Sequence, residues 1–181
     1  MSRALALVVL LNAASARASV GAISIDELIR RSDLIVIATV RSVDVENRVR
    51  IATAEVNEVL AGAPGATVRF IAQPQMRCSV ATAVPGEQVL LFLKTSSASE
   101  PAWIALYGRG RLPLRSIDGE RFAVWPGKVW PETLGLWEAL EPSDERVVAL
   151  DELIARIRKV VKEMAEDREA SSLRSLQHSP G

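Results

Sequence analysis

The stretch Leu34-Ile35-Val36-Ile37-Ala38-Thr39-Val40 is the clearest structural signal in the sequence. Most of its side chains are β-branched, and nearly all of them are apolar. Residues of this kind favour extended backbone on a buried, pleated surface. The stretch therefore predicts a central strand of a sheet, around which we expect the other elements to be arranged.

Four further segments downstream have strand character. Residues 68–71, 89–93 and 103–107 are short runs rich in β-branched, apolar or aromatic side chains. In residues 49–56 the apolar positions change parity near Ala52-Thr53. Such a change of phase indicates a β-bulge, so we expect a long, curved strand there.

A hairpin is expected around Asp118-Gly119. This dipeptide separates residues 112–117 from residues 121–124, and both segments are rich in apolar side chains. Asp-Gly between two such runs is a strong hairpin signal, because both central residues of the favoured turn have positive φ angles. Glycine and proline in residues 61–65 and 85–86 mark turns between the earlier strands.

A short helix is expected before the central strand. Ser24-Ile25-Asp26-Glu27 is a capping box, in which the Ser24 hydroxyl can accept from the N–H of Glu27 while the Glu27 carboxylate reaches back. The helix should run to about Arg31.

A second helix is expected near the C-terminus. Apolar residues recur there at spacings of four, three, four and three: Leu150, Ile154, Ile157, Val161 and Met164. This spacing is typical of an amphipathic helix. Residues 146–150 could form a short strand before it. The chain is polar from residue 166, and we expect residues 166–181 to be a disordered tail.

These elements predict a protein that is mainly β with flanking helices, built as a small barrel or sandwich. Residues 32–40 resemble the first barrel strand of the tissue inhibitors of metalloproteinases, the netrin-like branch of the OB-fold. The order of elements up to residue 93 is also similar, as it is to a broad group of exported bacterial proteins. The resemblance implies a small OB-like β-barrel with a short N-terminal helix and a C-terminal amphipathic helix, forming one domain over residues 19–165.

The N-terminus has the layout of a secretory signal peptide. Arg3 precedes an apolar run over residues 4–11, and Ala16-Arg17-Ala18 is a small-x-small cleavage site. We expect residues 1–18 to be removed after Ala18 and the mature chain to be secreted or periplasmic. The run is too short to remain as a membrane span, so no stable membrane insertion is expected. A buried N-terminal helix is the alternative.

The composition favours a folded domain and argues against a nucleic-acid partner. Of 181 residues, 49% are hydrophobic and 24% are charged, and the formal net charge is +0. Proteins that bind nucleic acid non-specifically rely on basic charge, and single-strand binders add aromatic platforms. The first four expected strands contain only two aromatic residues, Phe70 and Phe92, and both are expected in the core.

No catalytic, metal or cofactor site is expected, and the protein is predicted not to be an enzyme. Cys78 is the only cysteine, so it cannot form a disulfide within the chain. We expect it to be a small buried hydrophobe, with an intermolecular bridge as the alternative. The only histidine, His178, lies in the expected tail, where it cannot be held against a nucleophile. Zinc sites need clustered Cys and His, which the sequence lacks.

One segment is rich in the residue types of binding hot spots. It holds all the tryptophans, at positions 103, 125, 130 and 137, together with several arginines. Trp125, Trp130, Arg109 and Arg111 are therefore the candidates for a partner surface. Two alternatives remain open: the tryptophans pack a core against the C-terminal helix, and residues 108–111 form a turn or bulge rather than an anion cradle.

Two functions are consistent with these features. The first is an exported, non-enzymatic binding module of the cell envelope or extracellular space, a monomer that meets an unknown protein or glycan. The second is a secreted protease inhibitor. The tissue inhibitors use an N-terminal cysteine to chelate the protease zinc, and the expected mature N-terminus, Ser19, has no cysteine near it. Such an inhibitor would therefore have to act without that wedge.

Overall fold

The computed structural model describes residues 24–73, 82–97, 100–105, 109–125, 138–139 and 146–177. Within these ranges the chain forms two helices and nine strands. In chain order they are α1 (Ile25–Arg30), β1 (Leu34–Glu46), β2 (Val49–Ala61), β3 (Thr67–Ile71), β4 (Gln88–Lys94), β5 (Trp103–Ile104), β6 (Arg111–Ile117), β7 (Glu120–Trp125), β8 (Glu138–Ala139), β9 (Arg146–Ala149) and α3 (Leu150–Gln177).

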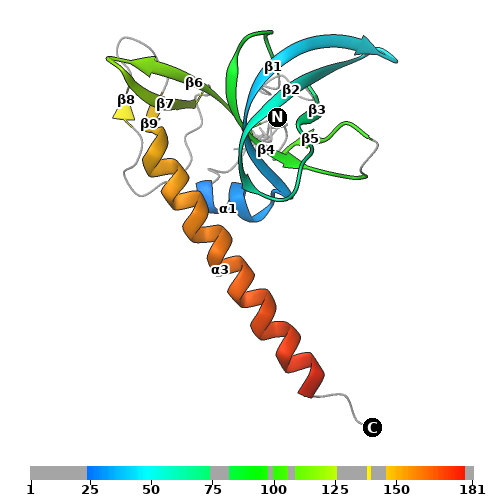
Figure 1. Ribbon diagram of the computed structural model, residues 1–181, viewed down its shortest axis with the longest axis vertical. Coiled ribbons are helices and arrows are strands. Elements are labelled where there is room, and N and C mark those ends of the chain that lie inside the picture. Colours follow the sequence, from blue (N-terminus) through cyan, green and yellow to red (C-terminus); the bar gives the residue numbers. More distant parts are fainter. Residues whose placement is uncertain are drawn as a thin grey trace, which may run out of the picture.

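The strands form one sheet in the order β3-β2-β1-β4-β6-β7-β9-β8, with β5 beside β4. Every pair of neighbouring strands is antiparallel. Figure 1 shows the β1–β5 part and the hairpin of β6 and β7 extending in different directions from β4. The predicted class, mainly β with flanking helices, is confirmed.

The β3 strand is linked to the segment that leads into β5. The N–H of Ala102 donates to the Arg69 carbonyl at 2.8 Å, and the N–H of Ile71 donates to the Ala102 carbonyl at 2.9 Å. These two bonds form a parallel bridge between Phe70 and Ala102. The residues that follow, Trp103 and Ile104, then pair with β4.

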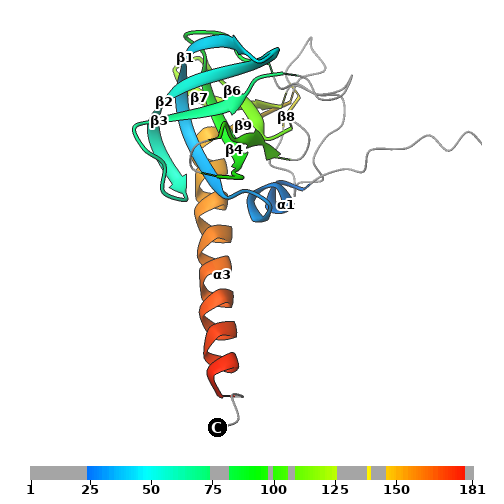
Figure 2. The ribbon, with the colours of Figure 1, turned by 90° about the vertical axis from the view of Figure 1, so that its right-hand side faces the viewer.

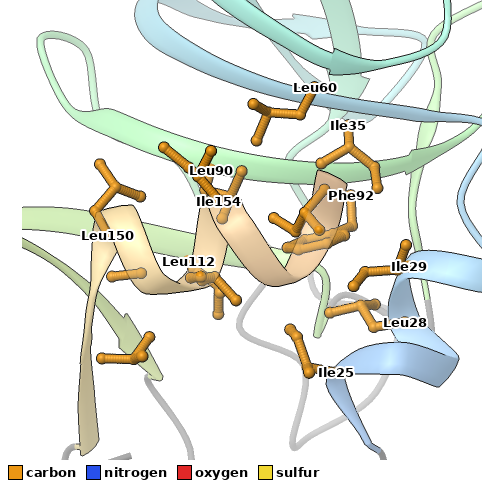
Figure 3. Packing of buried hydrophobic residues seen from close by; sticks show 14 of the residues in the cluster. Ile25, Leu28, Ile29, Ile35, Leu60, Leu90, Phe92, Leu112, Leu150 and Ile154 are labelled. Atoms are coloured by element: carbon orange, nitrogen blue, oxygen red, sulfur yellow. The ribbon is translucent and has the colours of Figure 1, made fainter. Parts of the chain in front are cut away.

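The first half of β1, residues 34–40, is buried on both faces, which explains its unbroken apolar run. Ile35 and Ile37 belong to the core between the sheet and the two helices. Val36, Ala38 and Val40 belong to a second core on the opposite face. Figure 3 shows the first of these cores, with strand side chains meeting side chains from α1 and α3. The predicted central strand is therefore confirmed, and it extends further than the quoted stretch.

Pairing of β1 with β2 is irregular at three places. The sequence predicted a bulge on the β2 strand near Ala52-Thr53. The residue left over near that point is instead Arg41 of β1, because Val40 pairs with Ala54 and Ser42 pairs with Thr53. The pair of strands is bulged near the expected point, but the extra residue lies on β1 and not on β2. Which of the two strands carries it is set by the register between them.

The remaining strands follow the sequence patterns with two exceptions, β5 and the two-residue strand β8, which the sequence did not predict. Asp118 and Gly119 both have positive φ angles, 51° and 86°, and they join β6 to β7 as the hairpin signal predicted. The possible short strand before the last helix is present as β9. The strand expected over residues 103–107 is shorter than predicted, because β5 ends at Ile104 and Ala105 is helical.

The α3 helix begins directly after β9 and continues to Gln177. The sequence predicted a disordered tail from residue 166, and this is wrong for residues 166–177. Figures 1 and 2 show this part of α3 projecting away from the sheet. Good helix formers support it there, and the hydroxyls of Ser171 and Ser172 donate to the carbonyls of Asp167 and Arg168. An apolar stripe marks where a helix packs, not where it ends.

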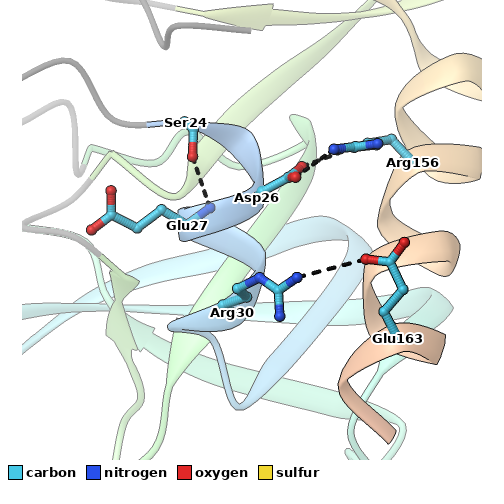
Figure 4. A network of polar contacts seen from close by, with 6 residues as sticks. All are labelled: Ser24, Asp26, Glu27, Arg30, Arg156 and Glu163. Atoms are coloured by element: carbon cyan, nitrogen blue, oxygen red, sulfur yellow. Dashed lines mark hydrogen bonds and ion pairs between the residues drawn. The ribbon is translucent and has the colours of Figure 1, made fainter. Parts of the chain in front are cut away.

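The α1 helix is fixed to α3 by ion pairs beside a shared core. The Ser24 hydroxyl accepts from the Glu27 N–H at 3.1 Å, so half of the predicted capping box is confirmed. The other half differs, because the Glu27 carboxylate pairs with Arg31. The Asp26 carboxylate accepts hydrogen bonds from Nε and Nη2 of Arg156, and the bond from Nε is 2.8 Å long (Figure 4). Hydrogen bonding to Asp26 raises the pKa of Arg156.

Several predictions fall outside the described residues. They concern the signal peptide over residues 1–18, Cys78, Trp130 and the tail beyond Gln177. In the part of the chain that the structure describes, neither helix is both long enough and apolar enough to cross a membrane.

Candidate functional site

The four residues of the predicted partner surface do not share one environment. Trp125 is 4% exposed and Arg111 is 5% exposed, so both belong to the interior. Arg109 is half-buried, and Trp130 is not among the described residues. A buried side chain cannot contact a partner on the folded surface. Any partner surface therefore has to be formed without Trp125 and Arg111.

Trp125 ends the β7 strand and packs into the core beneath α3. Its cluster includes Val148 of β9 and Leu150 at the start of α3. This is the alternative that the sequence left open, in which a tryptophan packs the core against the C-terminal helix. Trp103, by contrast, is 44% exposed.

Arg111 is buried because its chain passes closely over β4. A Cβ atom on Gly110 would lie 2.7 Å from the Phe92 carbonyl oxygen, a separation that real Cβ atoms do not show. The glycine thus allows the Phe92 N–H to reach the Gly110 carbonyl at 2.7 Å. The Arg111 guanidinium then meets the Glu87 carboxylate. Within the described residues this region is a close strand contact with an internal ion pair, and not an anion cradle.

A cavity lies at one end of the β1–β5 part of the sheet, and we call it the β3 slot. Its volume is about 400 Å³, within the range of small-ligand sites. Its walls come from the start of β1, the β2–β3 loop, the β3 strand and, between β4 and β5, residues 95–97 and 100–102. The lining residues are Asp33, Leu34, Ala63, Pro64, Gly65, Thr67, Val68, Arg69, Thr95, Ser97, Glu100 and Ala102.

The slot exists because β3 and the segment before β5 diverge. The two are bonded at Ala102, which pairs with Arg69 and Ile71. Towards the start of β3 no further bond joins the two among the described residues, and Thr67 and Glu100 both line the cavity. Both are exposed.

Main-chain groups of β3 face into the slot. Val56 of β2 donates to the Ala66 carbonyl, and Ala72 donates to the Arg50 carbonyl, each at 2.9 Å. Groups on a strand alternate in direction, so the even-numbered residues of β3 bond to β2 and the odd-numbered residues point the opposite way. The Thr67 carbonyl and the Arg69 N–H therefore face the slot. Neither has a backbone partner there among the described residues.

Asp33 forms a rigid corner of the slot. Its carboxylate accepts from the Lys94 ammonium at 2.6 Å and from the Thr95 N–H at 2.9 Å. Partial burial acts to raise the pKa of Asp33, but these hydrogen bonds and the charge of Lys94 outweigh it and the pKa lies below its ordinary value. Asp33 is thus ionised at neutral pH, and it ties the start of β1 to the end of β4.

The β2–β3 loop is held against Asp33 by Gly62. This glycine has a φ of +82°, and a Cβ atom there would lie 2.7 Å from the Asp33 carbonyl oxygen. Only glycine adopts this conformation at so close an approach without strain. On the other wall, the Arg69 guanidinium contacts both oxygens of Glu46 at 2.5 and 2.6 Å. The loop is therefore positioned by Asp33 at the corner of the slot, and the Arg69 cation by Glu46 outside it.

No residue of this slot was named as a site from the sequence. The glycine and proline of residues 61–65 were interpreted only as a turn, although they supply one wall of the slot. A polar slot between two strand ends leaves no periodic pattern, because its residues come from segments far apart in the chain. The only local signal was the polar character of the segment after β4.

Two further features of the described residues bear on chemistry. A smaller cavity of about 230 Å³ lies at the start of α3 and is lined mostly by charged side chains: Glu58, Arg121, Asp151, Ile154, Ala155 and Arg158. Among the described residues, no three His, Cys, Asp or Glu side chains are grouped so that they could hold a metal ion.

Comparisons with known proteins found no match to this chain. The sequence matches no protein-family model, and neither the curated proteins nor the solved structures yield a match. The function therefore has to be argued from the geometry of this chain.

Proposed function

We propose that the mature chain is an exported, non-enzymatic binding module, built on an OB-like barrel, that holds part of another molecule in the β3 slot. The observation that carries the proposal is the slot itself. It has the volume of a ligand site, fixed walls and main-chain groups directed into it. Slots of this kind bind ligands through a few placed polar groups.

The barrel part of the proposal is supported by the bonds around Ala102. The strand order β3-β2-β1-β4 places β3 and β4 at the two ends of a four-stranded run. The segment of Ala102 to Ile104 bonds to β3 at its start and pairs with β4 at its end. Because this one segment contacts both β3 and β4, it links the two ends of the four-stranded run. A link of this kind is expected where a small barrel closes.

Export is supported by the N-terminal sequence, with its apolar run and the small-x-small site before Ser19. The alternative function, protease inhibition, depends on the region of Ser19 and residues 72–82. Of these, only Ala72, Gln73 and Thr82 are described. The slot favours the binding module.

Export is tested by the mass of the protein recovered from its own host. We expect cleavage after Ala18, so that the intact mass matches a chain beginning at Ser19. Protein that keeps Met1 would contradict export through this signal.

Binding at the slot is tested with two probes, a displayed library of random peptides and a glycan array. We expect the mature chain to bind members of one probe set saturably. Gly65→Trp should weaken this binding at least about tenfold, because Gly65 lines the slot and a Cβ there meets nothing closer than 3.9 Å. A side chain at this position meets no obstacle at its Cβ, so an indole there should narrow the slot.

Val45→Trp is the matched control, since Val45 is 71% exposed near the opposite end of β1. It should leave binding unchanged. Saturable binding that Gly65→Trp does not affect would place the ligand elsewhere. The absence of binding to both probes would overturn the binding module.

A further inference from the structure

The exposed main-chain edge of β3 is suited to pair with one more strand. We infer that the β3 slot takes an extended peptide segment of a partner protein, which adds to β3 as a short strand and places a basic side chain beside Glu100. This inference rests on the proposed binding function and names the ligand class of that same site.

The pairing would repeat one that the chain already makes. Ala102 donates its N–H to the Arg69 carbonyl and accepts from the Ile71 N–H. A peptide residue that donates to the Thr67 carbonyl and accepts from the Arg69 N–H would form the same bridge two residues earlier on β3. At about 3.3 Å per residue, this displacement is roughly 7 Å. Main-chain bonds of this kind supply the affinity when a peptide extends a sheet edge.

The lining favours a peptide over a sugar. Sugar recognition commonly uses exposed aromatic rings, and no aromatic side chain lines the slot in the described part of the chain. The groups directed into the slot are instead an alternating carbonyl and N–H, which complement the same groups of another backbone. Thr67, the first residue of β3, is exposed, so a peptide can reach this part of the strand.

The charges of the slot favour a basic side chain. The positive charge of Arg69 is already balanced by Glu46, and the negative charge of Asp33 by Lys94. Glu100 is exposed and makes no ion pair with any described residue. It therefore leaves a negative charge at the wall opposite β3. A Lys or Arg on the peptide would complement this charge.

The probe is the displayed peptide library, with the most enriched peptide resynthesised for titration against the full mature chain. Arg69→Pro is the main variant. It removes the N–H that faces the slot but leaves the bonds of β3 to β2, and proline is tolerated on a strand edge of this kind. Arg69→Ala is its control, because it removes the side chain and keeps the N–H. Because both variants lose the side chain and only one loses the N–H, we expect Arg69→Pro to bind about tenfold or more weakly than Arg69→Ala.

A second measurement leaves the protein unchanged, in case Arg69→Pro does not fold. Single N-methyl groups are placed along the peptide, one position at a time. We expect a loss of about tenfold at the position that donates to the Thr67 carbonyl, with little effect at the positions next to it, because neighbouring N–H groups of a strand point in opposite directions. Glu100→Gln should weaken the binding of peptides with a basic residue several-fold.

The outcomes separate this inference from the proposed function. An equal effect of Arg69→Pro and Arg69→Ala, N-methyl losses with no alternation, or enriched peptides without basic residues would overturn the strand-addition model. Binding to glycans alone, still blocked by Gly65→Trp, would also overturn it while the binding module stands. If neither probe binds, the proposed function fails as well.

Discussion

Trp125→Ala is expected to lower the free energy of unfolding by about 3–5 kcal/mol, the range found when a buried tryptophan is truncated. Trp125 is 4% exposed and packs with Val148 and Leu150 where β7, β9 and α3 meet. Removing the indole leaves a cavity that these rigid elements cannot fill by collapsing. Urea denaturation of the mature chain, followed by far-ultraviolet circular dichroism, measures the change.

Trp103→Ala is the matched control for this variant. Trp103 is 44% exposed on the two-residue strand β5, so its loss should cost no more than about 1 kcal/mol. A result in which both variants cost the same small amount would contradict the placement of Trp125 in the core. It would also restore Trp125 as a candidate for the partner surface.

Glu87→Ala is expected to cost about 3 kcal/mol of stability, because it leaves the Arg111 guanidinium buried without its carboxylate. The Arg111 side chain is 6% exposed and that of Glu87 is 21% exposed. Within the described residues, Arg111 Nε already lacks a partner, so no spare acceptor is at hand there to replace Glu87. The same urea denaturation measures this loss.

Two comparisons test the cause of that loss. Glu58→Ala breaks the exposed pair with Arg158, whose atoms are 3.0 Å apart, and should cost less than about 1 kcal/mol. The double variant Glu87→Ala with Arg111→Met should regain most of the lost stability, because it removes the buried charge together with its partner. A double variant as unstable as Glu87→Ala alone would show that the loss is one of packing and not of charge.

Much of the secondary structure was predictable from the sequence, because its causes are local. The β1 and β4 strands have the apolar runs of strands buried on both faces, and the Ser24 cap marks the start of α1. Asp118-Gly119 supplies the two positive φ angles that the β6–β7 hairpin needs. In each case a few neighbouring residues determine the backbone, so no knowledge of distant partners was required.

The candidate site could not be predicted in the same way. The β3 slot combines residues from three separate segments of the chain. The groups that face into it are main-chain atoms of Thr67 and Arg69, which have no side-chain signature. The aromatic and basic segment did have a signature, typical of a binding surface. That signature does not distinguish an exposed tryptophan from a buried one, and Trp125 and Trp103 have opposite environments.

The sequence by itself determined most of the strands, where the hairpin turns and where α1 begins, because backbone preference and apolar spacing act over a few residues. Only the tertiary structure decided the rest. Register between β1 and β2 placed the bulge at Arg41. The close approach of Gly110 to Phe92 made Arg111 an interior residue, where Glu87, distant in sequence, pairs with it. The bonds of Ala102 to β3 fixed where pairing stops and the slot begins. Burial, register and cavities depend on which segments meet, and that depends on long-range contacts that no local pattern contains.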